Sequence, residues 1–112
     1  MPKRTVTLLL EDMLLACDRI LTYTKDISYS EFVADVKTTD ATVRNIQILG
    51  EAASQIPKDF QAQHPDIEWS KIIRSRHILV HAYFELDYGI IWRIATDYLP
   101  PLAGKLRVIV EK

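Results

Sequence analysis

The sequence predicts an all-α protein, an antiparallel bundle of about five to six helices that forms one domain over residues 1–112. Apolar residues recur at steps of three and four along most of the chain, which is the spacing of one buried helix face. No alternating apolar and polar run meets a hairpin turn, so strand pairs are not indicated. The hydrophobic content of 48% in 112 residues is sufficient for a core without disulfides or a metal.

The first half of the chain contains three predicted helices. Residues 5–23 form a long amphipathic helix, and a capping box at Ser28-Tyr29-Ser30-Glu31 opens a short helix that runs through Val36. Asp40 is the predicted N-cap of a third helix, which Pro57 closes. The apolar residues expected on the buried faces of the two long helices are Leu10, Met13, Leu14, Cys17, Ile20, Leu21, Val43, Ile46, Leu49, Ala53 and Ile56.

The second half begins with a connector, residues 57–66, whose two prolines and polar residues leave room for about one helical turn. A fourth helix is predicted from Trp69 to about Phe84. Asp87 is the N-cap of a fifth, Pro100-Pro101 ends it, and residues 102–110 form a terminal helix. The stripe of the fifth helix that should be buried comprises Tyr88, Ile91, Trp92, Ala95 and Leu99.

Charge and cysteine content limit the possible functions. The formal net charge of −1 argues against coating of nucleic acid by charge alone, so any RNA contact is expected to be local. The single cysteine, Cys17, is expected to be a small buried hydrophobe in a reducing cytoplasm. Acidic residues and an arginine interrupt the apolar run after Leu8, so we expect neither an export signal nor a membrane span.

The candidate catalytic residues lie within eight positions of the fourth helix, from Arg76 to Tyr83. An arginine binds phosphate through a planar fork of donors, and a histidine moves protons near neutral pH, so this segment suits metal-independent cleavage of an RNA phosphodiester. The pair His77 and His81 has helical i,i+4 spacing and could hold a metal. No cysteine or acidic ligand lies close in the sequence, so we expect no metal and no cofactor.

A helical wheel at about 100° per residue separates the faces of the fourth helix. The core side carries Ile72, Ile78, Leu79 and Ala82, and the opposite side carries Arg74, Arg76, His77 and His81. Arg76 and His81 diverge by roughly 140° on an ideal helix. Between them lie Ile73, Val80 and Phe84, which a monomer would expose. This apolar arc predicts a homodimer through the fourth helix, with basic and imidazole groups in the cleft.

These residues also carry a family resemblance. The pattern Arg76-His77-x3-His81-x-Tyr83 resembles the motif of HEPN ribonucleases, and the tyrosine resembles that of the HepT-like toxins of HEPN/MNT toxin–antitoxin pairs. His77 stands where that family more often has asparagine. Further similar segments cover most of the chain: Gly50-Glu51-Ala52, Trp69, Ile72, Trp92 and Leu99-Pro100-Pro101-Leu102.

The resemblance implies a dimeric, metal-independent RNase that cuts by internal attack of a 2′-hydroxyl. His81 would move a proton, and Arg76 would stabilise charge on the phosphorane. The second proton-transfer group would be His77 or His81 of the partner subunit. Glu51 either belongs to a solvated face or orients Arg76, and the sequence favours neither.

The resemblance further implies a partner, a minimal (MNT) nucleotidyltransferase antitoxin that silences the toxin by transferring AMP to Tyr83. On chemistry alone Tyr83 is an ordinary core or interface aromatic. An alternative function is a non-catalytic HEPN module that assists a nucleotidyltransferase by binding its substrate or pairing with it. The presence of both Arg76 and His81 favours the toxin RNase.

Overall fold

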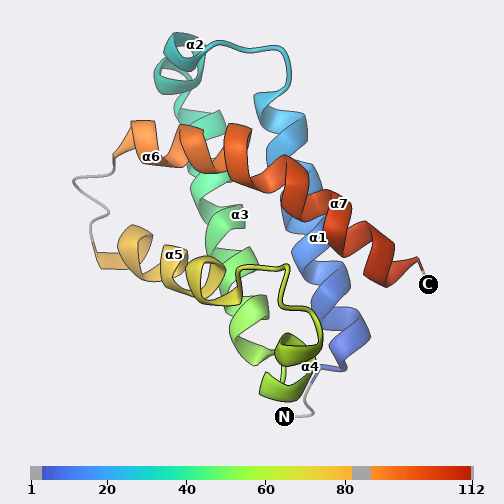
Figure 1. Ribbon diagram of the computed structural model, residues 1–112. Helices are drawn as coiled ribbons and strands as arrows, with labels where there is room; N and C mark the ends of the chain where they lie inside the picture. The colour runs from blue at the N-terminus through green and yellow to red at the C-terminus, as the bar shows by residue number, and fades with distance from the viewer. Residues whose placement is uncertain (1–3, 82–86, 112) are drawn as a thin grey trace.

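The computed structural model describes residues 4–81 and 87–111, and the regular elements of that part of the chain are all helices (Figure 1). The all-α prediction is therefore confirmed. The elements follow in the order α1 (Val6–Thr24), α2 (Tyr29–Ala34), α3 (Val36–Gln55), α4 (Lys58–Gln63), α5 (Trp69–His81), α6 (Tyr88–Arg93), the π-helical segment η2 (Ile94–Tyr98) and α7 (Leu99–Val110). No helix in the described residues is long and apolar enough to cross a membrane.

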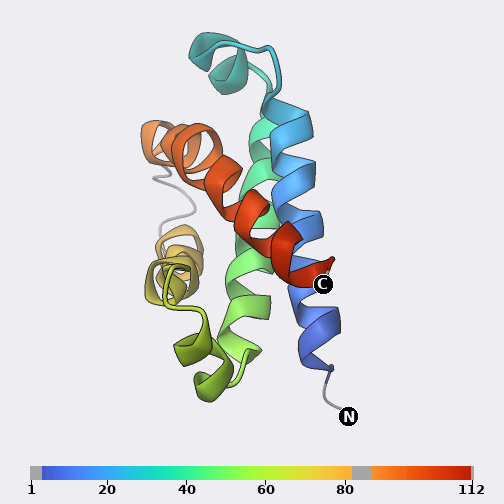
Figure 2. The ribbon, with the colours of Figure 1, turned by 45° about the vertical axis from the view of Figure 1, so that its right-hand side comes forward.

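The two long helices, α1 and α3, form an antiparallel pair around which the other elements are arranged (Figures 1 and 2). Thr5 caps α1, because its hydroxyl accepts a hydrogen bond of 3.2 Å from the amide of Leu8. The predicted apolar stripes of both helices point inward: Leu10, Met13, Cys17, Ile20, Ile46, Leu49, Ala53 and Ile56 are buried, and Leu14, Leu21 and Val43 are partly buried against the core. The residues of α1 and α3 that the apolar period predicted to face inward are therefore buried or partly buried in the structure.

The predicted start of the third helix was wrong. Asp35, not Asp40, is the N-cap of α3: its carboxylate accepts hydrogen bonds from the amide (3.3 Å) and the hydroxyl (2.8 Å) of Thr38. Asp40 lies in the second turn and is exposed. The preceding helix, α2, has the predicted capping box of Ser28 and Glu31 and ends at Ala34, so Asp35 alone separates the two helices.

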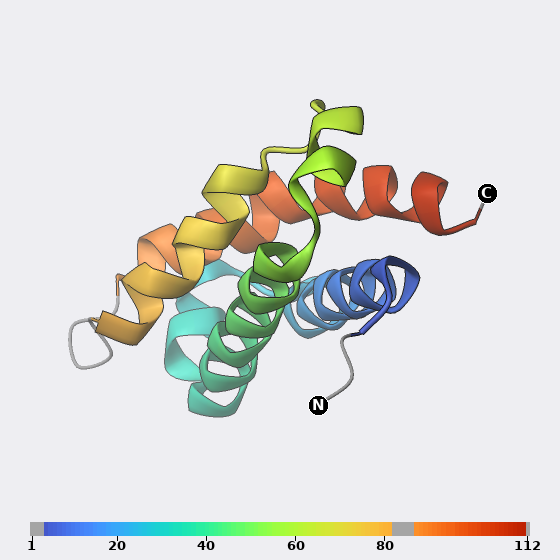
Figure 3. The same cartoon turned by 90° about the horizontal axis from the view of Figure 1, so that it is seen from below.

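The connector after Pro57 contains a six-residue helix, α4, where about one turn was predicted. The chain then turns back into α5, and Trp69 anchors this turn by burying its ring and donating from Nε1 to the carbonyl of His64 (3.0 Å). Among the described residues, α5 packs chiefly against α3 (Figure 3). Seen from below, α5 lies on the side of α3 away from α1. Helices α1 and α5 thus both pack against the central helix α3.

The C-terminal arm is one continuous helical path through α6, η2 and α7, and the prediction that Pro100-Pro101 ends a helix was wrong. Both prolines lie in the first turn of α7. A proline ring clashes with the carbonyl four residues earlier in an ordinary α-helix. The wider π turn, in which the amide of Leu99 donates to the carbonyl of Ile94, relieves this crowding. Tyr88, predicted to be buried, is exposed at the start of this arm.

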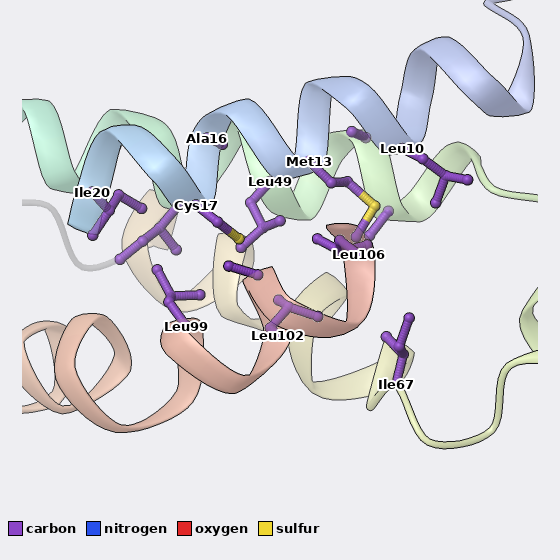
Figure 4. Close-up of a cluster of buried hydrophobic side chains, with 14 of the residues drawn as sticks. Leu10, Met13, Ala16, Cys17, Ile20, Leu49, Ile67, Leu99, Leu102 and Leu106 are labelled. Carbon is purple, nitrogen blue, oxygen red and sulfur yellow. The ribbon is translucent and has the colours of Figure 1, made fainter. Parts of the chain in front are cut away.

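The core lies where this arm crosses the α1–α3 pair (Figure 4). Met13 and Cys17 of α1 meet Leu49 of α3 and Leu102 of α7 there. Burial of each such side chain contributes about 1.5–3 kcal/mol relative to exposure. Burial, and secondarily the charge of Asp18, raises the pKa of the Cys17 thiol to about 12, so this cysteine behaves as a hydrophobe, as predicted.

Candidate active site

The motif helix α5 crosses α3 at Gly50, and the crossing depends on that glycine. A Cβ atom added at Gly50 would lie 2.9 Å from Cβ of Arg76 and 3.1 Å from the carbonyl oxygen of Ile72. Contacts this short would force α5 to shift away from α3. The carbonyl oxygen of Ile72 belongs to the backbone of α5, and Cβ of Arg76 is bonded directly to that backbone. The missing side chain therefore brings the backbone of α5 close enough for Arg76 to reach α3.

At this crossing, Arg76 contacts two polar residues of α3. Its Nη1 donates to Oε2 of Glu51 and to Oγ of Ser54, the latter at 3.0 Å. Ser54 in turn donates its hydroxyl hydrogen to the carbonyl of Glu51 at 2.6 Å, so acceptor and donor roles on Ser54 are both filled. The Arg76 side chain is 24% exposed and that of Glu51 is 62% exposed. Nη1 of the guanidinium is thus held by hydrogen bonds to Glu51 and Ser54, at a place that is partly open to solvent.

The other edge of the guanidinium carries donors that no described residue accepts. Nε of Arg76 is buried and has no hydrogen-bond partner among the described residues, and Nη2 makes no hydrogen bond with them. A buried donor without an acceptor costs free energy, on the order of 1–3 kcal/mol. An Nε–Nη2 edge matches the geometry of two phosphate oxygens. The edge of Arg76 that could pair with an oxyanion thus has no acceptor among the described residues, and its Nε is shielded from solvent.

Arg76 lies at one end of a hollow of about 450 Å³ between the start of α1, one face of α3 and α5. Five charged residues line this hollow, and four of them form two ion pairs. Arg4 binds Asp12 through two hydrogen bonds of 2.8 and 3.0 Å, and Arg76 binds Glu51. Uncharged residues complete the lining: Leu9, Gln47, Ile48, Ala52 and Gln55, and Arg44 is the remaining charged group.

The remaining predicted site residues fall partly or wholly outside the described residues. His77 and His81 belong to α5 by backbone, but their side chains are not among those described, and neither is that of Val80. Tyr83 and Phe84 lie outside the described residues altogether. The predicted dimer arc is therefore seen only at Ile73, which is partly buried against the core.

Sequence reasoning missed Ser54 as a contact of Arg76. Ser54 lies three residues after Glu51, and side chains three apart on a helix are neighbours. A glycine followed by Glu51 and Ser54 on one stripe was the available signal, but it becomes informative only when α5 is known to cross there.

The geometry defines an all-α bundle whose motif helix carries an arginine bonded to Glu51 and Ser54 of the central helix, and comparison with known proteins agrees with this class. The chain belongs to the ribonuclease HepT-like family, whose model matches residues 13–109. It is 40% identical over 96 residues to "Probable ribonuclease HepT" of Thermococcus cleftensis, covering 86% of this chain and 87% of that protein.

Two further relatives extend the likeness over nearly the whole chain. "Putative RNase MJ1380" of Methanocaldococcus jannaschii is 33% identical, covering 97% of this chain and all of the relative (100%). "Putative RNase TTE0752" of Caldanaerobacter subterraneus is 36% identical, with 92% of each chain covered. No solved structure matches this chain.

Proposed function

We propose that this protein is a metal-independent endoribonuclease and the toxin of a toxin–antitoxin pair. The observation that carries the proposal is the guanidinium of Arg76, which Glu51 and Ser54 hold at Nη1 and whose Nε–Nη2 edge has no acceptor among the described residues, five residues before His81 on the same helix. Membership of the ribonuclease HepT-like family and the names of three relatives support RNA as the substrate. The local character of the site fits a chain whose net charge is −1.

In the proposed reaction, the 2′-oxygen of the substrate attacks the adjacent phosphorus and the bond from phosphorus to the 5′-oxygen breaks. The products carry a 2′,3′-cyclic phosphate and a 5′-hydroxyl. Arg76 stabilises the charge that develops on the phosphoryl oxygens, because its donors are already oriented by Glu51 and Ser54. His81 takes the proton from the 2′-hydroxyl or gives one to the leaving oxygen. His77 or His81 of the partner subunit makes the other transfer.

The test is RNA cleavage in EDTA. We expect the purified protein to cut RNA with chelator present and to leave 2′,3′-cyclic phosphate ends. Arg76→Ala and His81→Ala should each abolish cleavage, and His77→Ala should have a smaller effect. Arg74→Ala is the matched control on the same helix, since Arg74 is exposed and hydrogen-bonds only to the carbonyl of Ser70 within the described residues.

Loss of cleavage on chelation, or full activity of the His81→Ala variant, would exclude this mechanism. An unmutated protein that binds RNA without cutting it would favour the non-catalytic module that assists a nucleotidyltransferase. Circular dichroism of each variant separates loss of chemistry from loss of the helical fold.

Control of the toxin is proposed to act on Tyr83. A nucleotidyltransferase antitoxin transfers AMP from ATP to the Tyr83 hydroxyl and releases pyrophosphate; Tyr83 follows Arg76 by seven residues in the sequence. The added phosphate then occupies the guanidinium that would bind RNA. Co-expression with a nucleotidyltransferase encoded beside this chain should add the mass of one or more AMP units at Tyr83.

Tyr83→Phe keeps the ring and removes the acceptor hydroxyl. This variant should escape silencing while cutting RNA as the unmodified protein does. Mass spectrometry of the neutralised toxin supplies the decisive comparison. Full neutralisation with unmodified Tyr83 would show that the antitoxin acts by binding alone.

A further inference from the structure

We propose that Arg44 forms a second phosphate-binding subsite, which holds the RNA backbone next to the phosphate bound at Arg76. This inference rests on the proposed ribonuclease function and adds a residue to its substrate contacts. It starts from the 450 Å³ hollow that Arg44 and Arg76 line together. The motif itself supplies only one arginine to that hollow.

The charges of the hollow single out Arg44. Asp12 engages the guanidinium of Arg4 with both carboxylate oxygens, and Glu51 engages that of Arg76. Three arginines and two carboxylates line the hollow, which leaves one positive charge in excess. Arg44 is exposed and makes no salt bridge within the described residues, so the excess charge resides there.

The helix sets the spacing between the two subsites. Arg44 and Glu51 are seven residues apart on one stripe of α3, which corresponds to about 10.5 Å along the helix axis. Gln47 lies between them and also lines the hollow. Its amide both donates and accepts hydrogen bonds, as a ribose hydroxyl requires. A strand with one phosphate at Arg76 would therefore pass along this stripe and place a neighbouring phosphate near Arg44.

A single subsite of this kind suits the composition of the chain. With a net charge of −1, the protein lacks the broad positive surface that binds RNA without a defined path. Two phosphate contacts, at Arg76 of α5 and Arg44 of α3, would instead fix the path of a short single strand. Contacts to phosphate position the strand and do not read its sequence. We therefore expect the same Arg44 contribution for RNAs of different sequence.

Binding of an uncleavable RNA as a function of salt tests the subsite. The probe is a fluorescent oligoribonucleotide methylated at every 2′-oxygen, which keeps all phosphates and lacks the attacking hydroxyl. Anisotropy gives Kd between about 50 and 200 mM NaCl. For Arg44→Ala, the slope of log Kd against log salt should fall by about 0.7, the value for one phosphate contact on a single strand. Arg44→Lys should retain the slope, because it keeps the charge.

Two further arginines serve as matched controls. Arg19 is exposed on α1 away from the hollow, and Arg74 lines a different hollow on the other side of α5. Alanine at either position should leave the slope unchanged. A change with Arg74→Ala and none with Arg44→Ala would place the RNA on the other side of α5 and overturn the proposal.

The same experiment separates this inference from the proposed function. If the unmutated protein cuts RNA but Arg44→Ala does not alter the slope, the subsite is wrong and the ribonuclease stands. If Arg44→Ala lowers the slope while no RNA is cut under any condition, the subsite stands and the cleavage proposal fails. Absence of any binding of the probe to the unmutated protein would overturn the subsite.

Discussion

At the scale of single residues, the three nitrogens of the Arg76 guanidinium differ in their hydrogen bonding. Nη1 is committed to Glu51 and Ser54, whereas Nε and Nη2 have no described acceptor. An arginine held at one corner loses less side-chain freedom when a phosphate binds its other edge. In the proposed reaction Glu51 would be a positioning residue that acts through Arg76.

Glu51→Gln tests this positioning role. Glutamine keeps the shape of the side chain and removes its charge, so the guanidinium of Arg76 should be held less firmly. We expect kcat for RNA cleavage to fall roughly tenfold, which is within the range that a small misplacement of a catalytic group costs. Thermal stability should change little, because the Glu51 side chain is 62% exposed and ion pairs open to solvent contribute about 0–1 kcal/mol. Steady-state kinetics and a melting curve measure the two effects. Glu11→Gln, an identical change at an exposed position of α1, is the control.

Unchanged kcat in the Glu51→Gln variant would mean that Ser54 and the helix crossing alone orient Arg76. A large loss of melting temperature would mean instead that the pair is structural.

At the scale of elements, Gly50 at the crossing of α3 and α5 and Gly104 on α7 have opposite predicted effects on stability. Gly50→Ala gains helix propensity of about 1 kcal/mol but forces a Cβ against α5, and overpacking of this kind costs about 1–3 kcal/mol. We expect net destabilisation together with reduced RNA cleavage. Gly104→Ala has open space around its Cβ on α7, so it should stabilise by up to about 1 kcal/mol.

Urea denaturation of both glycine variants gives the comparison directly. Equal stability of Gly50→Ala and Gly104→Ala would show that α5 moves away from α3 at no cost, and the proposed dependence of the site on Gly50 would be lost.

The sequence predicted the helical periods well and the helix ends less well. The stripes of α1 and α3 were correct because each repeats over five turns, whereas an N-cap depends on a single residue. Asp35 and Asp40 both precede helical sequence, and only the hydrogen bonds from Thr38 distinguish them. Pro100-Pro101 has the composition of a helix stop. A π segment that carries the chain past two prolines depends on packing, which local sequence does not encode.

The contacts of the candidate site could not be predicted from the sequence. Arg76 was identified from local spacing, but its bond to Glu51 joins residues 25 apart in sequence. That bond requires the close approach of α3 and α5 at Gly50, which depends on how the two helices pack and not on the sequence of either one. For this reason the sequence left the role of Glu51 open.

At the scale of the whole molecule, assembly as a homodimer remains a prediction from Val80 and Phe84, because Ile73 of the predicted arc is partly buried against the protein's own core and not exposed as predicted. Val80→Glu should weaken the dimer, because an unpaired charge at an apolar contact is costly. Light scattering over a range of concentrations measures the mass. Val108→Glu is the control, since Val108 is 61% exposed on α7. A monomer mass at every concentration for the unmutated protein would contradict the predicted dimer.

The π segment also fixes the rotational phase of the terminal arm. Ile91, Ala95 and Leu99 are buried although they are spaced by four and four, a step that drifts by about 40° each time in a regular α-helix. The slower winding of residues 94–98 absorbs that drift. Deleting one residue there would restore ordinary winding and leave Leu102 and Leu106 facing the core, because four α-helical steps turn the chain about as far as five steps of the wider segment. Deleting one residue from the regular helix of α7 would instead rotate everything beyond it by about 100° and turn Leu106 out of the core.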